Sequence, residues 1–148
     1  INKIDPNSHM FILSVYGSKS KPLIEFAQNK PGVLILKTVP SDHLRFIDIH
    51  VVTLMPKWTN VCLPSKAYSA VSQGCCLLLN CSRESDLFLE LKDASWFFEH
   101  NDHDSLENLF QNMSIEQISK KKLAAMSLAE NLQDIKKKAF DQISQMLK

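Results

Sequence analysis

Glycine is scarce in this chain, and its scarcity argues against loops that wrap a phosphate or a cofactor. Only three glycines occur among 148 residues. A phosphate-binding loop needs a second glycine immediately before its lysine, so that backbone amides can curl around the phosphates. The stretch GSKSK at residues 17–21 has no such glycine. We therefore interpret it as a polar turn that precedes a helix, and we expect the protein to use no cofactor.

The chain also lacks an excess of charge and a long apolar run. Its 17 Lys and Arg residues nearly balance 16 Asp and Glu residues, so direct nucleic-acid binding is not favoured. No apolar run approaches the roughly 18 residues that a membrane span requires, and the first residues do not resemble a signal peptide. With 45% apolar and 22% charged residues, we expect one globular domain, residues 10–148, located in the nucleus or alternatively in the cytoplasm.

Metal-binding motifs are missing, although three of the four cysteines lie close together in QGCCLLLNC, residues 73–81. Structural zinc sites use ligand pairs two to four residues apart, and the chain has no C-x-x-C pair. Cys75 and Cys76 point to opposite faces of any strand, so at most one of them could join Cys81. A zinc ion would also need Cys62 and either His100 or His103 to converge from afar. We predict buried thiols in a strand, with a metal site as the alternative.

Catalytic motifs are missing too. The sequence has no G-x-S-x-G elbow and no recognisable surroundings for a nucleophilic cysteine. The carboxylate pairs Asp102/Asp104 and Glu84/Asp86 lie in polar connections, where ionised surface groups are expected. We predict a protein that is not an enzyme. The alternative is an unfamiliar α/β enzyme, which would need His50, His100 or His103 to meet a cysteine or a carboxylate in a pocket.

The pattern of apolar residues predicts a mixed fold. Residues 10–16 and 33–37 form strands on either side of a helix that begins near Ser20 and stops at Lys30-Pro31-Gly32, which is the length of a right-handed βαβ unit. Residues 45–54 alternate like a strand but also carry helical spacing from residue 41, and we choose the strand. A helix over 64–74 follows. Residues 75–81 and 85–93 then form an antiparallel hairpin. We expect an α+β or α/β domain with a mixed sheet of five or six strands, the sixth over 94–100, and a helix that begins near residue 102.

The last part of the chain, residues 114–147, is predicted to be helical because it contains neither glycine nor proline. Ser114 with Gln117 and Ser127 with Glu130 form capping boxes, so one long helix and two helices joined near 126–127 both fit. An apolar stripe follows helical spacing through Ala125, Leu128, Leu132, Ile135 and Ala139, and it continues after a one-residue slip through Ile143, Met146 and Leu147.

This stripe has two interpretations, which the sequence leaves open. It could pack on the domain's own sheet, or it could bind another chain or a second copy of the protein. We expect the second, with an aromatic of the SWFFEH stretch beside it, and we predict that Leu128→Asp or Leu132→Asp abolishes binding in a folded domain. The predicted partner-binding residues are Leu128, Leu132, Ile135, Phe140, Ile143 and Trp96.

The start of the chain carries the one resemblance that we find. Ser8-His9-Met10 is similar to a cloning scar, which would remove residues 1–9 from the natural protein. Alternatively, residues 3–7, KIDPN, resemble the A-D-P-N ending of an ankyrin repeat. With FILSVYGSKSKPLIEFAQ after it, the stretch resembles the region that follows the ankyrin repeats in the M-phase phosphoprotein eight family, chromodomain subunits of the human silencing hub complex. The resemblance implies a nuclear, non-enzymatic module that recruits the scaffold subunit of a chromatin-silencing complex, and it identifies no functional residue.

Overall fold

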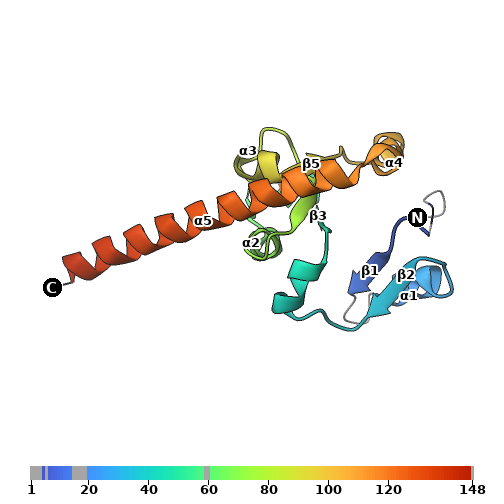
Figure 1. Ribbon diagram of the computed structural model, residues 1–148, viewed down its shortest axis with the longest axis horizontal. Coiled ribbons are helices and arrows are strands. Elements are labelled where there is room, and N and C mark those ends of the chain that lie inside the picture. The colour runs from blue at the N-terminus through green and yellow to red at the C-terminus, as the bar shows by residue number, and fades with distance from the viewer. Residues whose placement is uncertain (1–4, 6, 15–19, 59–60, 148) are drawn as a thin grey trace.

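The protein is a mixed α+β structure with two small parallel sheets and one very long C-terminal helix (Figure 1). The computed structural model describes residues 5, 7–14, 20–58 and 61–147. The polar turn at 17–19 and the end of the first predicted strand at 15–16 therefore lie outside the described residues. So do residues 1–4 and 6, which carry most of the ankyrin-like motif.

The predicted βαβ unit is confirmed at the N-terminus. Strand β1 (Phe11–Ser14) and strand β2 (Val33–Leu36) pair in parallel, and helix α1 (Lys21–Ala27) connects them. A proline in the first turn suits α1 because its missing N–H would have no helical partner there. Gly32 adopts a left-handed conformation, with φ of 74°, at the turn into β2. The edge-to-face contact between Phe11 and Phe110 joins this unit to the rest of the molecule.

The second sheet has three strands in the order β3 (Ile49–Thr53), β4 (Cys76–Asn80) and β5 (Ser95–Phe97). Both pairings are parallel, and the register places Leu79 between Val52 and Phe97. The central strand β4 is buried along its whole length, which explains its continuous apolar sequence. The prediction of one mixed sheet of five or six strands is therefore wrong, because the five strands of the described residues divide into sheets of two and three.

Residues 85–93 correct a second prediction, since they form helix α3 (Asp86–Leu91) and not a strand of a hairpin. The Ser85 side chain caps this helix by accepting a hydrogen bond from the Phe88 backbone N–H at 3.2 Å. Leu87 and Leu91, one helical turn apart, are buried, whereas Leu89 between them is exposed. An alternation of period two also places leucines four residues apart, so this short run satisfied both patterns.

The ambiguous stretch 41–55 contains both of the elements that its pattern suggested. It begins as a 3₁₀ helix, η2 (Ser41–Phe46), and continues as strand β3 after two residues. A 3₁₀ turn, η3 (Pro56–Trp58), and helix α2 (Ser65–Val71) follow. Gly74 lies shortly after α2 with φ of +77°, where a Cβ atom would come within 3.3 Å of Met126. Gly74 is thus favoured by its backbone angle, and the Met126 side chain of the long helix lies against it.

The C-terminal region forms helix α4 (His103–Asn112) and helix α5 (Ile115–Met146), which is one unbroken helix. A reciprocal capping box between Ser114 and Gln117 starts α5, as predicted, and no joint occurs near 126–127. The first half of α5 packs on the body of the molecule, while the second half projects away from it (Figure 1). The buried core that α5 covers consists of Val52, Ala67, Ala70, Val71, Cys75, Leu77, Leu79, Cys81, Leu87, Leu91, Ala94 and Ala125.

Candidate protein-docking surface

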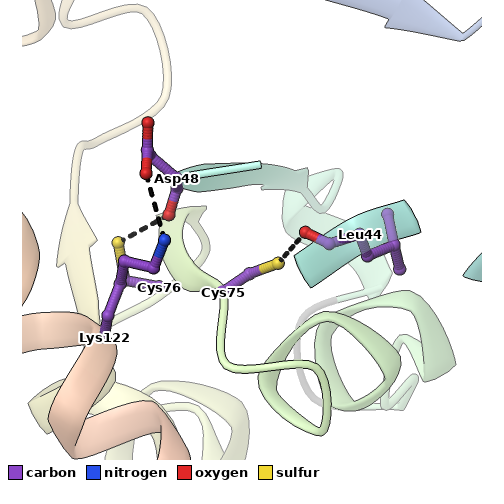
Figure 2. Close-up of polar contacts among 5 residues, drawn as sticks. All are labelled: Leu44, Asp48, Cys75, Cys76 and Lys122. Carbon is purple, nitrogen blue, oxygen red and sulfur yellow. Dashed lines mark hydrogen bonds and ion pairs between the residues drawn. The ribbon is translucent and has the colours of Figure 1, made fainter. Parts of the chain in front are cut away.

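Cys76, the first residue of β4, and Cys75 just before it are buried and make two hydrogen bonds to the segment before β3. The Cys75 thiol donates to the backbone carbonyl of Leu44 at 2.7 Å, and the Cys76 thiol donates to that of Asp48 at 3.0 Å (Figure 2). Burial raises the pKa of both thiols, and that of Cys76 reaches about 12. The prediction that the clustered cysteines are buried in a strand region is therefore confirmed, with Cys81 buried as well and Cys62 exposed.

The Asp48 carboxylate lies near these thiols and pairs with the Lys122 ammonium. Within residues 5, 7–14, 20–58 and 61–147, no group of three or more His, Cys, Asp and Glu side chains is placed to hold a metal ion. Cys75 and Cys76 each face a backbone carbonyl, and His100 and His103 belong to the turn before α4 and to its first residue. The structure thus does not bring together the zinc ligands that the alternative interpretation would require.

His50, on β3, has a pKa lowered from its usual value. Burial is the main cause and the nearby Lys66 ammonium adds to it, so the pKa falls below the usual value. The unfolded chain therefore binds a proton at this site in a pH range where the folded chain does not. Folding stability should decrease as the pH falls below the unfolded value of about 6.5.

We expect His50→Gln to weaken this acid destabilisation, because glutamine keeps polarity and similar length but does not titrate. Urea unfolding of the two chains between pH 8 and pH 5 would measure it. The free energy of unfolding of wild type should drop more steeply with acid than that of the variant. Equal slopes would show that His50 is not the group responsible.

Two lysines attach the first half of α5 to the body. The Lys122 ammonium lies 3.1 Å from the Asp48 carboxylate, beside Cys76 (Figure 2). The Lys121 ammonium donates to the backbone carbonyls of Lys92 and Asp93 at 3.1 and 3.2 Å. Burial lowers the pKa of Lys121, although Asp93 partly opposes this shift. The lysine run 120–122 is therefore not simply a solvated face, since two of its members contact other elements.

The apolar stripe of α5 divides between core and solvent. Ala125 is fully buried, and Leu128 packs against the core from a half-buried position. Leu132 is half-buried, whereas Ile135, Phe140 and Ile143 are 63%, 69% and 57% exposed. Large apolar side chains at this exposure in one helix segment indicate a surface that another molecule covers.

Helical geometry gathers most of these side chains on one face of the projecting half. At about 100° per residue, five residues occupy an arc about 80° wide. Phe140 lies about 60° outside this arc, on the side of Ile143. We call the five residues the distal stripe, and they are Leu132, Ile135, Ala139, Ile143 and Met146. An arc of this width suits the seam of a helix that packs against one other helix.

The predicted binding residues consequently do not form one surface. Trp96 is half-buried in β5, and the Lys121 ammonium lies 5.8 Å from the centre of its ring. Lys121 precedes Ile135 by fourteen residues, or about 21 Å along the helix axis. Leu128 belongs to the packed half of α5, so a charge there would disturb the core before it tested binding. Substitutions at Ile135 and Ile143 are the sharper test.

Sequence reasoning did not single out a second group of exposed apolar residues around β3. The strand lies at one edge of its sheet, so its outer side has no neighbouring strand among the described residues. The sequence does contain a signal for this group. Large apolar residues recur in the short connections around β3, and such connections offer no helix or strand to bury them. The exposed members of the group are Phe46, Val51, Met55, Trp58, Val61 and Leu63.

Comparisons with known proteins place the chain in no family. No family model matches it, and neither curated proteins nor solved structures gave a match. None of the helices over the described ranges is both long and apolar enough to cross a bilayer.

Proposed function

We propose that the chain is a non-enzymatic docking module that binds another polypeptide through the projecting half of α5. The single observation that carries this proposal is the continuation of the apolar stripe beyond the body of the molecule. About 17 residues of α5 follow Ala129, the last one that packs on the core, and they extend for about 25 Å. A helix this exposed gains little from tertiary packing, so a binding partner supplies a reason for its apolar face.

The setting of this docking function follows from the resemblance at the N-terminus. The similarity to the family of chromodomain silencing subunits supports a nuclear location and a scaffold subunit of a chromatin-silencing complex as the partner. The near-neutral charge of the chain favours a protein over nucleic acid as the bound molecule. Self-association of the same stripe is the competing outcome, and the experiment below separates the two.

Site-specific photocrosslinking in cells tests the proposal. A photoreactive phenylalanine analogue at position 143, inside the distal stripe, should form an adduct with another protein. The same analogue at position 145, on the polar side of the same turn, is the matched control and should form little. Adding Ile135→Asp to the chain with the probe at 143 should reduce the adduct at least about tenfold, because a buried isoleucine contributes roughly 1.5–3 kcal/mol.

The outcomes are distinct. Equal labelling from positions 143 and 145, or none from either, would refute docking through this face. An adduct with twice the mass of the chain would identify a second copy as the occupant. Circular dichroism of the Ile135→Asp chain provides the folding control, since Ile135 is exposed and its replacement should leave the helical signal nearly unchanged.

A further inference from the structure

Lysines border the distal stripe, while the far side of the helix carries Lys137 together with three acidic residues. Lys136 lies about 20° beyond one edge of the stripe, and Lys138 lies about 60° beyond the other edge. Glu130, Asp134 and Asp141 fall on the opposite side of the helix, at least about 140° from the centre of the stripe. Lys136 and Lys138 form no salt bridge with any of the residues that the structure describes. The apolar stripe is thus bordered by two lysines, and Asp134 lies one helical turn before Lys138.

A second copy of the chain fits this arrangement poorly. Two copies paired side by side in register would place Lys136 and Lys138 at the same height on both helices. Two copies paired head to tail around residue 137 would do the same, whereas pairing around Ala139, the middle of the stripe, would place Lys136 opposite Gln142. In the first two registers like charges meet at the margins of the seam, which opposes association. A partner with negative charges at these margins would convert the same contacts into attraction.

We infer that the occupant of the distal stripe is an amphipathic helix whose apolar seam is flanked by acidic residues. This inference rests on the proposed docking function and specifies its partner. In a two-helix pairing, apolar residues fill the seam, while the residues that border it select the partner by charge. Lys136 and Lys138 hold these bordering positions, so they set the choice of partner, and the distal stripe supplies the buried contact.

Two designed peptides of about 17 residues test the inference, since this length matches the projecting part of α5. They share leucine and isoleucine at the seam positions, and the bordering positions carry glutamate in one and lysine in the other. Binding to the full chain is measured by fluorescence anisotropy at low and high salt. We expect the glutamate peptide to bind at least about tenfold tighter at 0.1 M salt. The difference should shrink near 1 M, where the screening length falls to about 3 Å.

Charge reversal on the chain provides the matched comparison. Lys136→Glu with Lys138→Glu should invert the preference between the two peptides. Lys120→Glu with Lys137→Glu changes the net charge equally, but neither residue borders the distal stripe, so this variant should retain the preference. Both pairs are exposed on α5, and circular dichroism would verify that the helix persists.

The remaining outcomes would contradict the acidic partner, with or without the docking function. If both peptides bind equally and Ile135→Asp with Ile143→Asp abolishes both, the docking function stands and the acidic partner is refuted. If neither peptide binds, the inference fails, and the photocrosslink from position 143 decides whether the docking function fails with it. If the chain forms a dimer that the same double variant dissociates, the occupant is a second copy and the inference is refuted.

Discussion

Ellman's reagent is expected to react rapidly with one thiol of the folded protein, that of Cys62, and with all four after unfolding. Cys62 is exposed, whereas Cys75, Cys76 and Cys81 are buried. The thiolate is the reactive form, and burial raises the pKa of Cys76 from 9.0 to about 12. Near neutral pH this shift lowers its thiolate fraction about a thousandfold, and burial blocks the reagent as well.

Cys62→Ser provides the control, because it should remove the fast reaction while leaving the urea unfolding curve unchanged. Two or more fast thiols in the native wild type would contradict the burial of β4. The same raised pKa values predict an alkaline effect on stability. The unfolded chain releases its thiol protons from about pH 9, but folded Cys76 keeps its proton until about pH 12, so the free energy of unfolding should decrease through this range.

Leu79→Ala is expected to lower the free energy of unfolding by about 2–5 kcal/mol. Leu79 is fully buried on the central strand of the larger sheet, where Val52 and Phe97 are its cross-strand neighbours. Its truncation removes apolar contacts and leaves a cavity that β4, held on both sides, cannot close. A loss of about 3 kcal/mol corresponds to a fall in melting temperature of roughly 10 °C for a chain of this size.

Leu89→Ala is the matched control because it makes the same chemical change on α3, where Leu89 is 55% exposed. Its cost should stay below about 1 kcal/mol, as for most surface substitutions. The pair also tests the conformation of residues 86–91. In a half-buried strand, Leu87, Leu89 and Leu91 would share one face, so Leu89→Ala would cost about as much as Leu79→Ala. Similar losses in urea titrations would therefore contradict the helix.

Local sequence patterns correctly predicted those elements in which the apolar pattern and the residues at the ends indicate the same structure. The βαβ unit was predictable because two short apolar strands flank a segment with a proline near its start and a glycine after its end. Strand β4 was predictable because a strand covered on both faces needs an unbroken apolar run. The start of α5 was predictable because Ser114 and Gln117 satisfy the first backbone N–H groups by themselves.

Residues 85–93 show where local patterns fail. Leucines at every second position include leucines at every fourth position, so the spacing fits a strand and a helix equally. The cap at Ser85 and the burial of Leu87 and Leu91 select the helix, and this choice makes β5 parallel to β4. The division into two sheets could not be predicted from local patterns either. Strands pair through backbone N–H and C=O groups, which are the same in every sequence, so a strand's own residues do not specify its neighbour.

The sequence by itself determined that the last quarter of the chain is helical and that one face of this helix is apolar. Only the tertiary structure decided where that face changes from core to surface. The reason is that helical spacing continues from Ala125 to Met146 with a single slip after Ala139, whereas burial depends on how far the body of the molecule extends beneath the helix. The body ends near Ala129, and the apolar residues beyond it therefore remain open to a partner.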